Sequence, residues 1–133
     1  MEVNASAHAA ALWVGLNLFV LLVLSLLVVR QRQKHKVVLG DGGVPELIQA
    51  IRAFGNATEY VPAGMAALTM LAVVGAPGLA IHITGFLVFV GRVLHGYGLS
   101  TSGGASLPRT LGVILTWVSY VFAGAALLFY SIA

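Results

Sequence analysis

Three polar residues at helical spacing stand beside a long apolar stretch. Arg52, Asn56 and Glu59 are spaced i, i+4 and i+7, which on a helix places them within roughly 60° of one another. The residues that follow, from Ala63 to Val74, are almost wholly apolar. Ionisable groups inside a membrane segment cost a few kcal/mol each, so they usually face the bundle interior and serve a function. A buried structural ion pair between helices is the alternative, and chemistry alone does not separate the two.

The composition indicates a membrane protein. The chain has 133 residues, of which 59% are hydrophobic and 8% charged, and its mean hydropathy is +0.99. A soluble domain of this size has too little interior to bury so much apolar surface, so the excess must face lipid. The absence of cysteine excludes disulfides, thiolate metal sites and a cysteine nucleophile. The seven Lys and Arg residues form no basic and aromatic patch, so we predict no nucleic-acid partner.

Four apolar runs predict an all-α membrane protein, a bundle of four transmembrane helices forming one domain over residues 1–133. We expect the helices at about 8–30, 45–74, 79–99 and 107–131. Asp41 is the candidate cap of the second helix, and Pro62 predicts a kink within it. The second helix, at about 45 Å, exceeds a hydrocarbon core of about 30 Å, so its first turns should project into water or headgroups. Gly98 to Gly104 is expected to be a flexible linker.

The basic residues predict the orientation. All seven fall at one expected end of the array, which the positive-inside rule makes cytoplasmic, and both termini then lie on the opposite side. These residues are Arg30, Arg32, Lys34, Lys36, Arg52, Arg92 and Arg109.

Several of these cations are expected at one membrane depth and point to a bound anion. Glu59 cannot neutralise four arginines, so an anion is the natural completion of the cluster. Arg109 is expected in the first turn of a helix, where free N–H groups also attract an anion. Snorkelling of Arg92 and Arg109 to lipid phosphates is the alternative. No His, Asp and Glu spacing suits a metal, so none is predicted. The predicted set is Arg30, Arg52, Asn56, Glu59, Arg92, His95 and Arg109.

The motif Arg52-x3-Asn56-x2-Glu59-Tyr60-x-Pro62 resembles the second-helix signature of the MAPEG family, the membrane-associated proteins in eicosanoid and glutathione metabolism. The basic first loop, Arg92-x2-His95 and the arginine at position 109 are similar to that family as well, so the resemblance covers nearly the whole chain. It implies a homotrimer with glutathione, as co-substrate, bound between subunits near the cytoplasmic side. It also implies that lipophilic electrophiles or peroxides reach a groove between the third and fourth helices from the bilayer.

By this resemblance each candidate residue has a role toward glutathione. Arg52, Asn56 and Glu59 would hold its backbone, with Glu59 on the ammonium. Arg30 and Arg92 would contact carboxylates with the help of His95. Arg109 would stabilise the thiolate, which is the nucleophilic form; His95 could equally be structural.

The expected function is therefore that of a glutathione transferase with possible peroxidase activity. The synthases of the family carry tyrosines after the third-helix arginine at spacings absent here, which favours a small bacterial member in the inner membrane. The alternative is a non-catalytic lipid-binding or scaffold protein of the same fold. A transporter built on Glu59 is a weaker third possibility, because no second internal carboxylate or pair of broken helices accompanies it.

Overall fold

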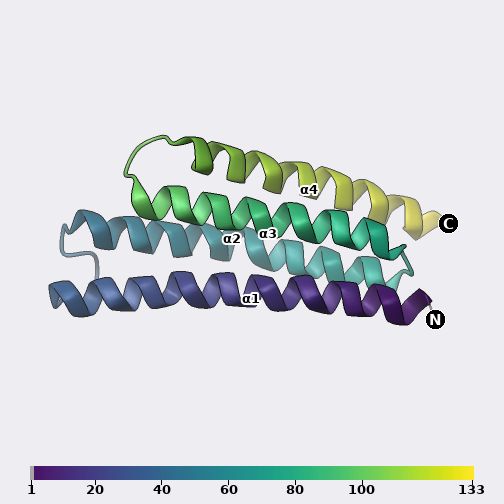
Figure 1. Ribbon diagram of the computed structural model, residues 1–133, viewed down its shortest axis with the longest axis horizontal. Helices are drawn as coiled ribbons and strands as arrows, with labels where there is room; N and C mark the ends of the chain where they lie inside the picture. Colours follow the sequence, from purple (N-terminus) through teal and green to yellow (C-terminus); the bar gives the residue numbers. More distant parts are fainter. Residues whose placement is uncertain (1) are drawn as a thin grey trace.

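The protein is a bundle of long helices. The computed structural model describes the backbone of residues 2–133 and the side chains of residues 5–133. Within that range the chain forms α1 (Glu2–His35), α2 (Pro45–Val73), α3 (Gly78–Thr101) and α4 (Leu107–Ile132). The four helices run side by side along the long axis of the molecule (Figure 1). The predicted all-α bundle is confirmed.

The helices form a simple up-and-down array. The first helix packs against α2 and α3, and α4 packs against α3 and α2. Figure 1 shows the α1–α2 and α3–α4 connections at one end of the bundle and both chain termini at the other. The basic residues after position 29 therefore belong to the half of the bundle that contains these two connections.

The surface of the bundle is suited to lipid. Three helices of the described chain are long and apolar enough to cross a membrane, namely α1 from Ala5, α3 and α4. Large apolar side chains, among them Phe19, Val121 and Leu128, are exposed along them. Exposed apolar surface on this scale is typical of side chains that contact lipid. The chain is an integral membrane protein, and α2 is not among these three helices, since its polar stripe interrupts the apolar run.

Helix α1 is longer than predicted. It continues through the basic cluster to His35, because basic side chains near a helix C-terminus interact favourably with the helix dipole. Lys36 then adopts a positive φ of 56°, and the Val37 N–H donates to the Arg32 carbonyl at 3.1 Å. This arrangement is a Schellman-type end, which closes the helix without a glycine.

Two further predictions about helix ends were wrong. Asp41 does not cap α2; its Oδ1 accepts from the Gly43 N–H at 2.9 Å within the preceding turn, and Val44 occupies the cap position without a side-chain hydrogen bond. The predicted linker at Gly98 is helical, because α3 continues to Thr101. Pro62 lies within α2 and does not end it.

Glycines let α3 and α4 approach at backbone distance. A Cβ at Gly91 would lie 2.8 Å from the Gly112 carbonyl oxygen, and a Cβ at Gly98 would lie 2.6 Å from the Arg109 nitrogen. Small residues at a helix contact allow such close packing in membrane bundles. Gly98 is therefore a packing residue, which explains why a glycine that looked like linker lies inside a helix.

The apolar core lies in two clusters along the bundle. One, near the termini, includes Leu68, Leu71 and Ile81. The other, nearer the connections, includes Leu24, Ala57 and Val61. Ser6 ties the start of α1 to the α2–α3 turn by donating to the Ala76 carbonyl at 2.8 Å. The candidate polar residues of α2 and α3 adjoin the second cluster.

Candidate functional site

Arg92 is the centre of a polar network that joins three helices. Its side chain is only 1% exposed. The Nε–H donates to Thr116 Oγ1 on α4 at 3.0 Å, and Nη1 donates to Asn56 Oδ1 on α2 at 2.7 Å. The structure therefore brings two of the predicted site residues, Asn56 and Arg92, into direct contact.

Two tyrosines complete the surroundings of the guanidinium. Arg92 Cζ lies 4.7 Å from the centroid of the Tyr60 ring, a cation–π arrangement. The Tyr120 hydroxyl donates to the Tyr60 carbonyl, and the two rings are 6.1 Å apart. Sequence reasoning missed these partners as site residues, although Thr116 and Tyr120 share one helical face with Arg109.

The guanidinium of Arg92 has only neutral partners in this network. Asn56, Thr116 and the Tyr60 ring carry no formal negative charge, and Arg92 Nη2 is buried without a hydrogen-bond partner. Leaving a buried donor unpaired costs about 1–3 kcal/mol, and more for a charged group. An uncompensated buried cation of this kind favours a nearby anion, either on a ligand or on another chain.

His95 and Arg109 lie farther along the α3–α4 contact. His95 is 5% exposed, and it packs so closely on α4 that a Cβ at Gly112 would lie 2.7 Å from the His95 Cβ. Arg109 is half-buried, and its Nη1 donates to the Gly104 carbonyl at a long 3.4 Å. The Arg109 guanidinium is thus weakly held at the start of α4, where free N–H groups also favour anions.

The other three predicted residues lie on the outside of the protomer. Arg30, Arg52 and Glu59 are exposed, on the faces of α1 and α2 that no other part of the described chain covers. Their side chains are not gathered with Arg92 into one cavity of a single chain. The described chain therefore does not form a site that uses all seven residues.

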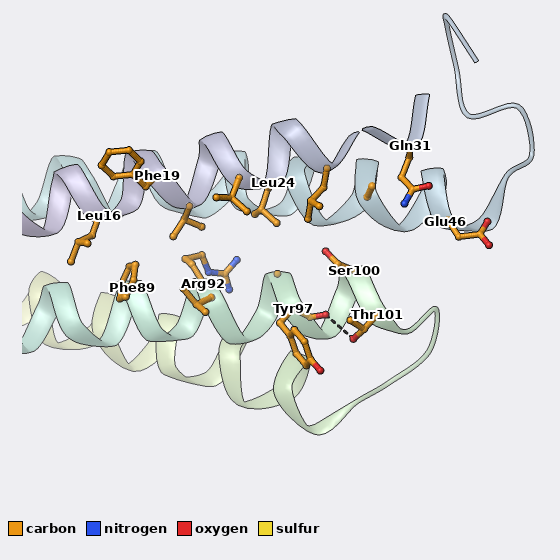
Figure 2. Close-up of a pocket in the computed structure, with 16 residues that line it drawn as sticks. Leu16, Phe19, Leu24, Gln31, Glu46, Phe89, Arg92, Tyr97, Ser100 and Thr101 are labelled. Atoms are coloured by element: carbon orange, nitrogen blue, oxygen red, sulfur yellow. Dashed lines mark hydrogen bonds between the residues drawn. The ribbon is translucent and has the colours of Figure 1, made fainter. Parts of the chain in front are cut away.

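The largest cavity is a groove between α1 and α3. It has a volume of about 610 Å³, and Arg92 is the one predicted site residue that lines it. Figure 2 shows apolar side chains such as Leu16, Phe19 and Phe89 at one end, with Gln31, Glu46, Ser100 and Thr101 at the other. A smaller cavity of about 210 Å³ is lined by residues of α2, α3 and α4, among them Thr84 and Ser119. The acceptor groove lined by the third and fourth helices stays a prediction.

Comparison with known proteins agrees with the helical arrangement. Residues 10–129 match the sequence model of the MAPEG family. Inner membrane protein YecN of Escherichia coli strain K12 is 35% identical to the chain over 121 residues, which are 91% of each protein. YecN of Escherichia coli O6:H1 shows the same identity and coverage. The family match covers most of the chain, including every candidate residue described above, and the chain therefore belongs to the MAPEG family.

Proposed function

We propose that the protein is a glutathione-dependent membrane transferase or peroxidase that acts on lipophilic electrophiles as a homotrimer. In this proposal glutathione binds between subunits near the connections, in a bacterial inner membrane. The end with the basic α1–α2 connection faces the cytoplasm and both termini face the periplasm. Membership of the MAPEG family and the cationic half of the bundle support this proposal.

The observation that carries the proposal is the exposure of charge on α2. Glu59 is exposed in the protomer, yet it lies about 21 Å along α2 from Pro45, well within the depth of a bilayer. Arg52 is exposed on the same stripe. Charged side chains facing lipid at such depth are costly. A second copy with a polar ligand between the copies would remove that cost, and glutathione offers an ammonium for Glu59 and carboxylates for arginines.

The protomer's geometry suggests how the work is divided among the residues. Arg92 fixes the amide of Asn56, because Oδ1 accepts from the guanidinium and Nδ2 is left to donate elsewhere. Asn56, Arg52 and Glu59 would hold the peptide backbone of glutathione, while Arg30 and His95 assist from the neighbouring surfaces. Arg92 would then act mainly through Asn56, and its buried charge would favour the acidic co-substrate.

Arg109 would stabilise the thiolate. A cation and a helix start both lower the free energy of the ionised thiol relative to the neutral form. The sulfur would lose its proton to water, attack the electrophilic carbon of the acceptor and form a C–S bond as the leaving group departs with the bonding electron pair. Arg109 needs only its weak contact with Gly104 to be displaced in order to reach a ligand.

The test measures binding and turnover separately. Glutathione and its sulfonate analogue should raise the apparent melting temperature of the purified protein, because both bind the folded state. Turnover of an aryl halide should fall by about 10²-fold or more in Arg109→Ala, while binding persists. Lys36→Ala removes an exposed cation at the same end and serves as the matched control.

The outcomes separate the two candidate functions. Unchanged turnover in Arg109→Ala would remove the role assigned to that residue. Glutathione protection without turnover of any electrophile would favour the non-catalytic binding protein. That alternative has support in Arg92, two of whose three guanidinium nitrogens donate to side chains of its own chain. Absence of protection by glutathione would refute the proposed co-substrate.

A further inference from the structure

The groove between α1 and α3 carries features of a ligand site that the proposed function does not use. Its walls come mainly from α1 and α3, with Glu46 and Ala50 of α2, and its volume of about 610 Å³ lies within the usual range for small-molecule sites, about 300–1,000 Å³. Phe19, Val23 and Val93 line it and are exposed on the outer surface. The groove is thus open laterally, toward the space that lipid occupies.

Three buried polar atoms that line this groove have no hydrogen-bond partner. They are Gln31 Oε1, Ser100 Oγ and Arg92 Nη2. Buried polar groups in native proteins are nearly always paired, with protein, water or a ligand. All three atoms belong to residues that line one groove, and they come from both α1 and α3. This indicates that the occupant of the groove brings polar atoms to the half that contains Gln31 and Ser100.

The length of the groove matches one leaflet. Gln31 and Leu16 line opposite ends of the α1 wall and are fifteen residues apart, which is about 22 Å along a helix. One leaflet, including its headgroup region, is about 20–22 Å thick. An acyl chain that enters at the apolar end of this path would therefore have its polar head near Gln31 and Ser100, as Figure 2 lets the reader follow.

The charged residues in and near the groove indicate which kind of lipid head group would bind at the end that contains Gln31 and Ser100. Arg92 projects an uncompensated positive charge into the groove from within. Lys34 lies one turn beyond Gln31 on the same face of α1 and, like the other basic residues of this segment, carries a positive charge. Glu46 is the acidic side chain in the lining, and it is exposed at the mouth. The balance favours a negatively charged head over a neutral or zwitterionic one.

We propose that the α1–α3 groove binds an acidic phospholipid of the surrounding membrane, with one acyl chain in the groove. The Ser100 hydroxyl would donate to the phosphodiester, and Gln31 Oε1 would accept from a hydroxyl of the head group. The second acyl chain stays in the bilayer, which the groove adjoins at its exposed residues Phe19, Val23 and Val93. This site lies within one protomer. It requires neither glutathione nor turnover, so its test is independent of the proposed enzymatic function.

The experiment counts retained lipids by native mass spectrometry. The protein is delipidated in a neutral detergent and offered phosphatidylglycerol or phosphatidylcholine with identical acyl chains. Val23→Trp fills the groove from α1, and Val29→Trp is the matched control. Both valines are exposed on α1, at 55% and 47%, but only Val23 lines the groove. The same spectra report the oligomeric state.

We expect one phosphatidylglycerol per chain, retained about tenfold more tightly than phosphatidylcholine, with the preference lost in Val23→Trp and kept in Val29→Trp. Equal retention of the two lipids would overturn the assignment of an acidic head. Equal loss, or no loss, in the two tryptophan variants would show that the lipid binds elsewhere. A smaller oligomer in Val23→Trp alone would identify the groove as a subunit interface and refute the proposal.

Discussion

Replacing Thr116 by valine tests whether the Arg92 network holds the bundle together. Valine keeps the shape of threonine but removes the oxygen that accepts from Arg92 Nε at 3.0 Å. A hydrogen bond to a charged group contributes about 1.5–3 kcal/mol. The guanidinium is already unpaired at Nη2, so the substitution would leave a second donor, Nε, without a partner. We therefore expect the free energy of unfolding to fall by about 2 kcal/mol, or about 30-fold in the folding equilibrium constant.

Thr69→Val is the control for this change. The Thr69 hydroxyl donates to the carbonyl four residues earlier at 2.9 Å, and the Thr116 hydroxyl does the same at 2.8 Å. Only Thr116 also accepts from an arginine. Unfolding in mixed micelles, followed by far-ultraviolet circular dichroism, should show Thr69→Val within about 0.5 kcal/mol of the parent protein. Equal stability of the two variants would refute the claim that Arg92 is fixed by this bond.

Three further variants test other parts of the structure. Gly112→Ala should lower the free energy of unfolding by about 1–3 kcal/mol in the same assay, because the new Cβ would overlap His95. Gly124→Ala should leave it unchanged, because the space around Gly124 is open. Equal effects of the two variants would contradict the tight α3–α4 contact. Glu59→Gln should change the melting temperature of the ligand-free protein little, since Glu59 is exposed in the protomer, but it should abolish the protection by glutathione. If the free energy of unfolding of the ligand-free variant fell by several kcal/mol, Glu59 would instead be an internal ion-pair partner. Gly85→Ala should displace the Trp13 indole, which occupies the space above Gly85, and so shift tryptophan emission to longer wavelength in a Trp117→Phe background; unchanged emission would contradict this packing.

The sequence was informative about which segments are helical and about which residues share a helix face. Apolar runs of this length leave few alternatives to membrane helices. The spacing of Arg52, Asn56 and Glu59 predicted one polar stripe facing the bundle interior, whereas Arg52 and Glu59 are exposed on the single chain and only Asn56 is partly buried. The ends were less predictable, because α1 continues into water as a charged helix and Gly98 serves packing within α3.

The contacts between helices could not be read from periodicity. A helical pattern gives the face that carries Arg92 but not the rotation of α3 against its neighbours. The hydrogen bonds of Arg92 to Asn56 and Thr116 could therefore not be predicted from the sequence. For the same reason periodicity did not reveal the groove between α1 and α3, and it did not reveal how closely Gly91 and Gly112 bring α3 and α4 together. Arg30, Arg52 and Glu59 face outward. The sequence pattern could not predict this, because it does not give the rotation of α1 and α2 within the bundle.

The glycine contacts between α3 and α4 also lock the vertical alignment of these two helices. Sliding α4 along α3 would move Gly91, Gly98 and Gly112 out of the close contacts that the lack of a side chain permits. These contacts therefore restrain α4 from sliding along α3, so that the two helices move together as one unit. An adjustment of the bundle to a guest molecule is therefore easier for α1, whose described part packs mainly against α2 and α3 and not against α4.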